Sequence, residues 1–197
     1  MFSGLVSLIV TADVSQAELE TRTISDAYYA SQTSTKYLVT YDVSTRGDVT
    51  GNLTDFKKII ADTFADNRGW VRAGVKFEEV ESGGKLHMVL ASPAEVKAIS
   101  PSGCSDTLSC TVKPYVLIND TRWMHGSDSY NALGVSLLSY RQMVINHEVG
   151  HFLGHNHIAS CETDTGLAPI MLQQSTGLRG CTANSWPLPS EIWVKGI

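Results

Sequence analysis

The pattern of hydrophobic and polar residues predicts short strands that alternate with helices. Residues 37–43 (YLVTYDV) are rich in β-branched and aromatic side chains, which favour a strand. Residues 52–65 follow with helical spacing, and one face carries Leu53, Phe56, Ile59, Ile60 and Phe64. Residues 75–80 alternate apolar and charged side chains like a half-buried strand. The turn at residues 82–84 and a strand at residues 86–91 come next, and we expect the two strands to form a hairpin.

From residue 93 onwards, the sequence predicts regular secondary structure as far as Gly154. A short helix is predicted over residues 93–99, because proline is favoured at the first helical position. A strand is predicted over residues 115–118 and a long helix from about residue 137 to 153. Gly154 marks the end of that helix, where positive φ is commonly required. The order of strand, helix, strands and helix indicates an α/β or α+β domain with a loop-rich C-terminal part.

Composition narrows the class of protein. The 197 residues are 43% hydrophobic, enough for one substantial core but too few for two independent catalytic domains. The formal net charge is −5, and the 15 lysines and arginines are scattered along the chain. Nucleic-acid binding requires clustered basic residues that displace counterions from phosphates, so we expect none.

The four cysteines fall into two local pairs, each of which brackets a loop rich in Gly, Ser and Thr. None belongs to a Cys-x-x-Cys unit, which argues against thiolate zinc ligation and thioredoxin-like chemistry. We therefore predict the disulfides Cys104–Cys110 and Cys161–Cys181 in an oxidising compartment. The alternative is four unrelated buried thiols in a cytosolic protein.

The N-terminal 35 residues are interpreted as a signal or anchor remnant followed by a linker. Residues 2–10 (FSGLVSLIV) have the length of a signal-peptide core but lack a preceding Lys or Arg, and the run is too short to span a bilayer. Residues 11–35 are polar and resemble a stem. This segment could tether the protein to a membrane, whereas the alternative for residues 2–10 is a first β-strand.

A cluster of histidines carries the strongest chemical signal, because four of the six lie in the short sequence HEVGHFLGHNH. His147 and His151 are four residues apart on the predicted helix, so their imidazoles share one face and can bind a single ion. Glu148 lies at the edge of this face, where its carboxylate can reach a water on the metal. Gly154 ends the helix and lets the chain return His157 as a third ligand. Three neutral imidazoles with an open fourth position are typical of a catalytic zinc.

This spacing, His-Glu-x-x-His-x-x-Gly-x-x-His, resembles the signature of the metzincin clan of zinc endopeptidases. The segments SYRQMVINHEVGHFLGHNH, APIMLQQSTGLRGC and NSWPLPSE are also similar to DUF3152, a bacterial, largely actinobacterial, metzincin-like family of unknown function, from about residue 36 to 192. The resemblance implies an α+β zincin fold with a small twisted mixed sheet and an active-site helix. The catalytic domain would span residues 36–197, divided at about residue 154 into an N-terminal subdomain and a loop-rich C-terminal subdomain (155–197).

Metzincins also place a methionine in a tight turn beneath the zinc. Met171, in the sequence APIM, corresponds to it by resemblance; the alternative is a loop methionine packed into the core. Some metzincins carry a tyrosine ligand two residues later, where this chain has Gln173. His155 is an additional histidine inside the motif, and the signature spacing favours His157 over it as the ligand.

The expected function is zinc-dependent hydrolysis of peptide bonds in protein or peptide substrates by a monomeric, extracytoplasmic enzyme. One Zn²⁺ would activate a water, with Glu148 as general base. The substrate would add as a strand to the edge of the sheet, for which we expect residues 86–91. Two alternatives remain open: a zinc-binding module without catalysis, suggested by Gln173, and a cell-envelope hydrolase of peptidoglycan cross-links.

Overall fold

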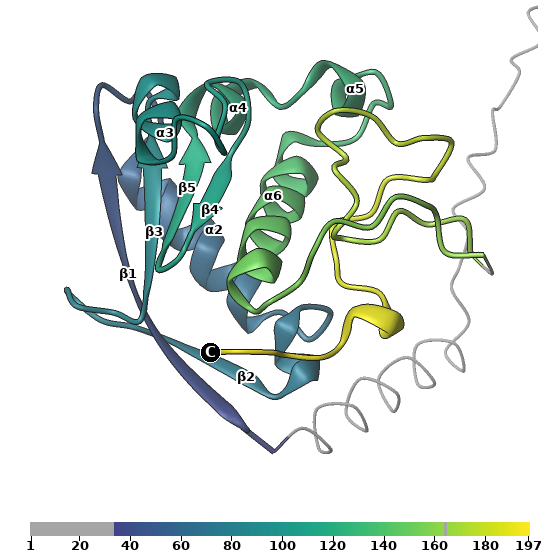
Figure 1. Ribbon diagram of the computed structural model, residues 1–197, viewed down its shortest axis with the longest axis horizontal. Helices are drawn as coiled ribbons and strands as arrows, with labels where there is room; N and C mark the ends of the chain where they lie inside the picture. The colour runs from purple at the N-terminus through teal and green to yellow at the C-terminus, as the bar shows by residue number, and fades with distance from the viewer. Residues whose placement is uncertain (1–33, 164) are drawn as a thin grey trace, which may run out of the picture. The chain divides into compact units, whose positions relative to one another are not determined.

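The computed structural model describes residues 34–163 and 165–197, which fold around one five-stranded mixed sheet (Figure 1). The predicted signal or anchor remnant and linker therefore lie almost entirely outside the described residues. The strands are β1 (Tyr37–Arg46), β2 (Val75–Glu79), β3 (Leu86–Ala91), β4 (Cys110–Val112) and β5 (Tyr115–Asn119). The helices are α2 (Leu53–Ala65), α3 (Pro93–Ile99), α4 (Asp120–His125), α5 (Asp128–Asn131) and α6 (Leu137–Phe152), with 3₁₀ turns η1 (Trp70–Ala73) and η2 (Pro189–Glu191).

The strand order is β2-β1-β3-β5-β4, and this corrects two predictions. β2 and β3 do not form a hairpin, because both pair in parallel with β1, which lies between them. β3 is not an edge strand, because it also pairs in parallel with β5. The edges of the sheet are β2 and β4, and β4 is the one strand that runs antiparallel to its neighbour.

A glycine-rich connection explains how the two strands flank β1. Glu79 at the end of β2 and Leu86 at the start of β3 are both in register with Tyr41 of β1. The connection between β2 and β3 therefore only has to cross β1 near Tyr41. Gly84 makes the step possible, since a Cβ at this residue would lie 2.7 Å from Tyr41 Cα. Its amide also donates to Asp42 Oδ2 at 2.8 Å. The glycines that resemble a hairpin turn in the sequence serve this close crossing instead.

Both long helices lie where the hydrophobic spacing predicts them. Asn52 caps α2 by accepting a hydrogen bond from the Asp55 amide, and the buried face of α2 includes Phe56 and Ile60. Ser136 caps α6 in the same way. From Met143 to Gly150, every residue of α6 is buried, so this helix lies inside the protein and not on its surface. The short helices α4 and α5 were not predicted, because four to six residues are too few to show helical periodicity.

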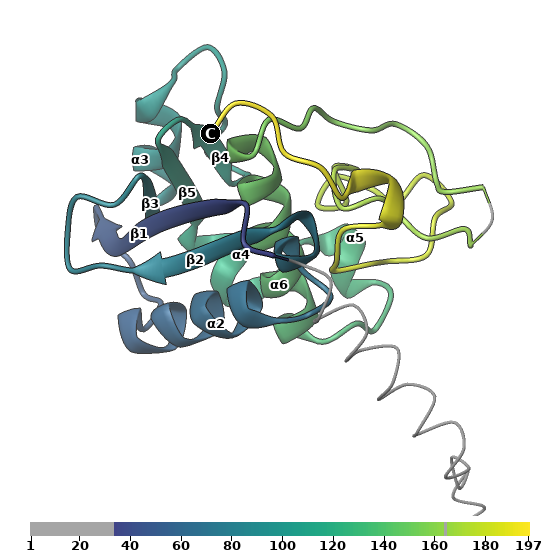
Figure 2. The same cartoon turned by 90° about the horizontal axis from the view of Figure 1, so that it is seen from below.

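Helices cover both faces of the sheet, as Figure 2 shows for α2 and α3 on opposite sides. The larger core lies on the side of α2 and α6; its members include Phe56, Ile60, Leu90, Ile118 and Val144. The smaller core joins α3 to the other face through Val89, Val96, Leu117 and Cys104. Each fully buried aliphatic or aromatic side chain contributes about 1.5–3 kcal/mol relative to an exposed one, so the two cores hold the sheet and α6 in a fixed relation.

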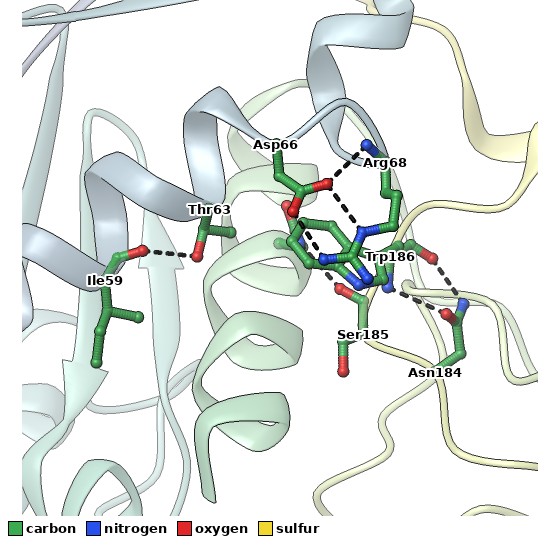
Figure 3. Close-up of polar contacts among 8 residues, drawn as sticks. Ile59, Thr63, Asp66, Arg68, Asn184, Ser185 and Trp186 are labelled. Atoms are coloured by element: carbon green, nitrogen blue, oxygen red, sulfur yellow. Dashed lines mark hydrogen bonds and ion pairs between the residues drawn. The ribbon is translucent and has the colours of Figure 1, made fainter. Parts of the chain in front are cut away.

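The irregular C-terminal region is joined to α2 and α6 by polar contacts (Figure 3). Arg68, just after α2, pairs with Asp66 at 2.7 Å and lies over the Trp186 ring at 4.2 Å. Asn184 holds Trp186 in place through two backbone hydrogen bonds. On α6, the Asn146 side chain donates to the Ser185 carbonyl at 2.9 Å. These contacts bring the residues after α6 back over the helix that carries the histidines.

Both predicted disulfides are present, Cys104–Cys110 and Cys161–Cys181, and no described cysteine is free. The first closes the loop that leads into β4, and the second closes the loop after α6. Two disulfides are consistent with an extracytoplasmic location. Among the described residues, no helix combines the length and the apolar character needed to cross a bilayer.

Candidate metal centre

Three histidines meet at the C-terminal end of α6. One ring nitrogen each of His147, His151 and His157 lies within 4.8 Å of the other two. The Nε2 atoms of His151 and His157 are 3.0 Å apart. His147 is buried, His151 is half-buried and His157 is exposed, so the cluster opens towards solvent on one side. These are the three ligands that the sequence predicts, and they lie close enough to bind one metal ion.

Backbone carbonyls set the orientation of the two helical histidines. The Nδ1 of His147 donates to the Ile170 carbonyl at 2.7 Å, and the Nδ1 of His151 donates to the His155 carbonyl at 2.9 Å. Each contact fixes the tautomer, because an Nδ1 that carries a hydrogen leaves Nε2 with its lone pair. The lone pairs are therefore available at the centre of the cluster, as ligand nitrogens require.

A sharp turn at Gly154 returns the chain to the cluster. Its φ is +103°, as the sequence predicts for the residue that ends this helix. The C-terminal segment passes closely here, since the Lys195 amide donates to the Leu153 carbonyl at 2.9 Å. A Cβ at Gly154 would collide with the Lys195 carbonyl oxygen. Only glycine satisfies both the conformation and the space at this turn.

We expect Gly154→Ala to destabilise the fold by about 2–5 kcal/mol, from backbone strain together with the collision. It should also weaken metal binding, because the turn places His157. Gly180→Ala is the matched control, since Gly180 has a φ of +87° but no atom within 4 Å of an added Cβ. Urea unfolding of both variants measures the difference. Equal losses of stability in the two variants would contradict the role of the Lys195 contact.

His155 is not part of the cluster, although it lines the same cavity. Its Nε2 donates to the Trp193 carbonyl at 2.9 Å, and its ring lies 3.6 Å from the Trp193 ring, centroid to centroid. Trp70 approaches from another side, with ring centroids 4.9 Å apart. This histidine contributes to the packing of the C-terminal segment, and its backbone carbonyl orients His151.

Glu148 places a buried carboxyl group beside the histidines. The residue is only 5% exposed, and it lines the same cavity as all three histidines. Its Oε2 accepts a hydrogen bond of 2.7 Å from the Thr111 hydroxyl of β4. Burial raises the pKa of Glu148 to about 7, against the opposing effect of the Thr111 hydrogen bond. A carboxyl group with this pKa can both accept and release a proton near neutral pH.

Burial has the opposite effect on the histidines. It lowers the pKa of His147 to about 3, with a further contribution from the neighbouring His151. The pKa values of His151 and His157 are also lowered, in each case mainly because the ring loses part of its contact with water, and the neighbouring His151 adds to the effect at His157. The three imidazoles are therefore neutral at neutral pH, which is the form that binds metals.

Met171 and its turn lie against the inner side of the cluster. Met171 is fully buried, and a Cβ at Gly150 of α6 would collide with its sulfur. The turn is held by Glu191, whose carboxylate accepts the amides of Ile170 and Met171, both at 2.9 Å, and that of Leu188 at 2.8 Å. The same Ile170 supplies the carbonyl that orients His147. The role of Met171 as the metzincin methionine stays a prediction. The turn that contains Met171 does support the histidine cluster, through the Ile170 carbonyl.

The histidines and Glu148 line a cavity of about 470 Å³. Its lining also includes residues of the loop closed by Cys104–Cys110, residues of β4 and residues 173–176. Met143 and Val144 of α6 lie in the cavity lining towards the N-terminal part of the helix. The histidine cluster and Glu148 therefore border one cavity.

Residues 15–189 match a protein family described as "Protein of unknown function (DUF3152)". The chain belongs to this family. The match confirms the resemblance to DUF3152, whereas the resemblance to the metzincin clan stays a prediction. The match begins further towards the N-terminus than residue 36 and ends at residue 189, before residue 192. No curated protein matches the chain.

Sequence reasoning missed two supporting side chains of this DUF3152 protein. Thr111 contacts Glu148 across 37 positions of the chain, and Glu191 contacts Met171 across 20. Glu191 belongs to the segment NSWPLPSE, which the family resemblance includes, and that is the one signal that could have drawn attention to it. Thr111 has no such signal, because a threonine beside a cysteine is common in any exposed loop.

Proposed function

We propose that this DUF3152 protein is a zinc-dependent endopeptidase. The observation that carries the proposal is that three neutral imidazoles and one buried carboxyl group line a single open cavity. A structural metal site has no need of a carboxyl group that is not a ligand, nor of access for other molecules. The arrangement therefore favours chemistry on a bound substrate.

The three histidines fit zinc as the bound ion. Two Zn–N bonds of about 2.0–2.1 Å at a tetrahedral angle separate the nitrogens by about 3.3 Å. The Nε2 atoms of His151 and His157 are 3.0 Å apart, and the His147 nitrogen lies within 4.8 Å of both. Imidazole is a ligand that suits zinc, and three such ligands leave a position for water. When bound, zinc lowers the pKa of a coordinated water to about 7 and polarises a carbonyl group.

The chain's own residues supply the proton transfers. The Glu148 carboxylate would accept a proton from water in the cavity and later deliver it to the departing amine nitrogen. Its pKa of about 7 suits both steps, since the group is neither too weak a base nor too weak an acid. The carbonyl oxygens of Ile170 and His155 keep His147 and His151 oriented during these steps.

An extended peptide would bind along β4. This strand is an edge of the sheet, and its residues Cys110 and Thr111 line the cavity. An edge strand can pair with an extended substrate through backbone hydrogen bonds. The substrate-binding strand is thus proposed to be β4, in place of the β3 segment that the sequence suggested.

The test is a measurement of zinc content combined with a substrate screen. Purified protein is assayed against casein, short peptides and cell-wall fragments, with and without a chelator. Chelator-sensitive cleavage of casein or peptides with about one zinc per chain is the expected result. Cleavage of cell-wall fragments alone would favour a hydrolase of peptidoglycan cross-links. Zinc binding without any cleavage would favour a non-catalytic module, the alternative suggested by Gln173.

Zinc affinity should be almost independent of pH from 7.5 down to 6.5. Protons compete with zinc for imidazole, and three histidines with the ordinary pKa of 6.5 would be half protonated at pH 6.5 but only about one-tenth protonated at pH 7.5, which lowers affinity about sixfold between these two pH values. Because burial lowers all three pKa values, the competition begins at lower pH. We expect a change below about threefold in this range, measured by chelator competition. A loss of about sixfold or more between pH 7.5 and 6.5 would show that the histidines titrate normally.

A further inference from the structure

One threonine joins the edge of the sheet to the carboxyl group in the cavity. The Thr111 hydroxyl oxygen lies 2.7 Å from Glu148 Oε2 and 2.9 Å from the Glu148 backbone carbonyl oxygen. Among the described residues, no other group forms a hydrogen bond with this carboxyl group. The orientation of the Glu148 side chain therefore depends on one hydroxyl group.

The position of Thr111 is itself well fixed. It lies at the centre of β4 and is in register with Val116 of β5. The preceding residue, Cys110, is tied by its disulfide to Cys104. Cys104 is buried in the smaller core beside α3. The hydroxyl is thus attached to the rigid sheet and not to a free loop, which is what an orienting group requires.

We propose that Thr111 is a positioning residue that holds the Glu148 carboxyl group in its reactive orientation. The inference rests on the proposed function, since it assigns Thr111 a role in the same reaction. It goes beyond the histidine motif, because Thr111 lies outside that motif and contacts Glu148 from β4.

The two contacts also tie the Glu148 side chain to its own backbone. The Thr111 hydroxyl lies within hydrogen-bond distance of the side-chain oxygen Oε2 and of the backbone carbonyl oxygen of the same residue. Thr111 therefore fixes the position of Oε2 relative to the backbone of α6.

A purely structural role would have a different consequence. If Thr111 only tied β4 to α6 through the Glu148 carbonyl, its loss would lower stability and leave the catalytic step of the folded enzyme unchanged. If it positions the carboxyl group, its loss should lower kcat with little change in KM, because a group misplaced by about 1 Å can cost about a hundredfold in rate.

The test compares Thr111→Val, which keeps the shape, with Thr111→Ser, which keeps the hydroxyl. Thr45→Val is the matched control, because Thr45 is an exposed threonine on β1 and is not among the residues that line the cavity. Zinc content should stay at the wild-type value in all three variants. We expect T111V to lower kcat by about ten- to a hundredfold with KM within about twofold, T111S to stay within about threefold of wild type, and T45V to match it.

Crystal structures provide a readout that needs no activity. In metal-free T111V the Glu148 carboxyl group should shift by about 1 Å or more, or change rotamer, whereas in T111S it should keep its place. A wild-type protein that cleaves no substrate would refute the proposed peptidase, and the crystal structures would still decide the role of Thr111. A carboxyl group that stays in place in T111V, or a T111V enzyme with wild-type kcat, would overturn the positioning role.

Discussion

Replacing Glu148 with glutamine is expected to lower kcat for peptide hydrolysis by about 10²- to 10⁴-fold while zinc remains bound. Glutamine has nearly the same shape and can still accept the hydrogen bond from Thr111, but its amide cannot take up a proton. The buried site is therefore preserved and the base is removed. Zinc content, kcat and KM are measured on the same preparations, together with Glu148→Ala, which should also abolish hydrolysis and retain zinc.

Glu81→Gln is the matched control for this variant, because Glu81 is exposed in the connection between β2 and β3. It should keep wild-type activity. An E148Q enzyme with more than about one-tenth of wild-type kcat would refute the general-base role. Loss of zinc together with activity would instead mean that Glu148 serves the metal site itself.

Replacing Glu191 with alanine is expected to destabilise the protein by about 3–5 kcal/mol. Glu191 is 1% exposed, and its two oxygens accept the backbone amides of Ile170, Met171 and Leu188. Without the carboxylate, three buried N–H groups lose their acceptor, and each unpaired group costs about 1–3 kcal/mol. Partial relaxation of the turn keeps the expected total below the full sum.

The same substitution should weaken zinc binding by about 10- to 100-fold, since the Ile170 carbonyl orients His147. Urea unfolding of the metal-free protein and chelator competition measure the two effects separately. Glu81→Ala serves as the control with an exposed carboxylate. A Glu191→Ala protein within about 0.5 kcal/mol of wild-type stability would show that the turn does not depend on the carboxylate.

The three candidate metal ligands were predictable from the sequence because the signal is local. His147 and His151 share a face whenever the segment is helical, since a helix repeats every 3.6 residues. Gly154 and its positive φ follow from the same reasoning about how helices end. The long helices α2 and α6 were predicted for the same reason, as their apolar positions recur within one or two turns.

The arrangement of the strands was not predictable in this way. The residues between β2 and β3 resemble a hairpin turn, yet β1 pairs with both strands and separates them. Which strand lies at the centre of the sheet depends on pairing between segments that are far apart in the sequence. No local alternation of apolar and polar residues encodes that choice, so the edge strand was assigned to β3 and not to β4.

By itself, the sequence determined which residues could bind a metal and where the helix beneath them ends. Only the tertiary structure decided how the site is supported, by Thr111 beside Glu148 and by Glu191 behind the turn of Met171. Both are polar residues in irregular or short segments, and they have the same sequence pattern whether exposed or buried. Their importance comes from the burial of the groups that they contact, because removal from water raises the Glu148 pKa to about 7 and makes each unpaired polar group costly.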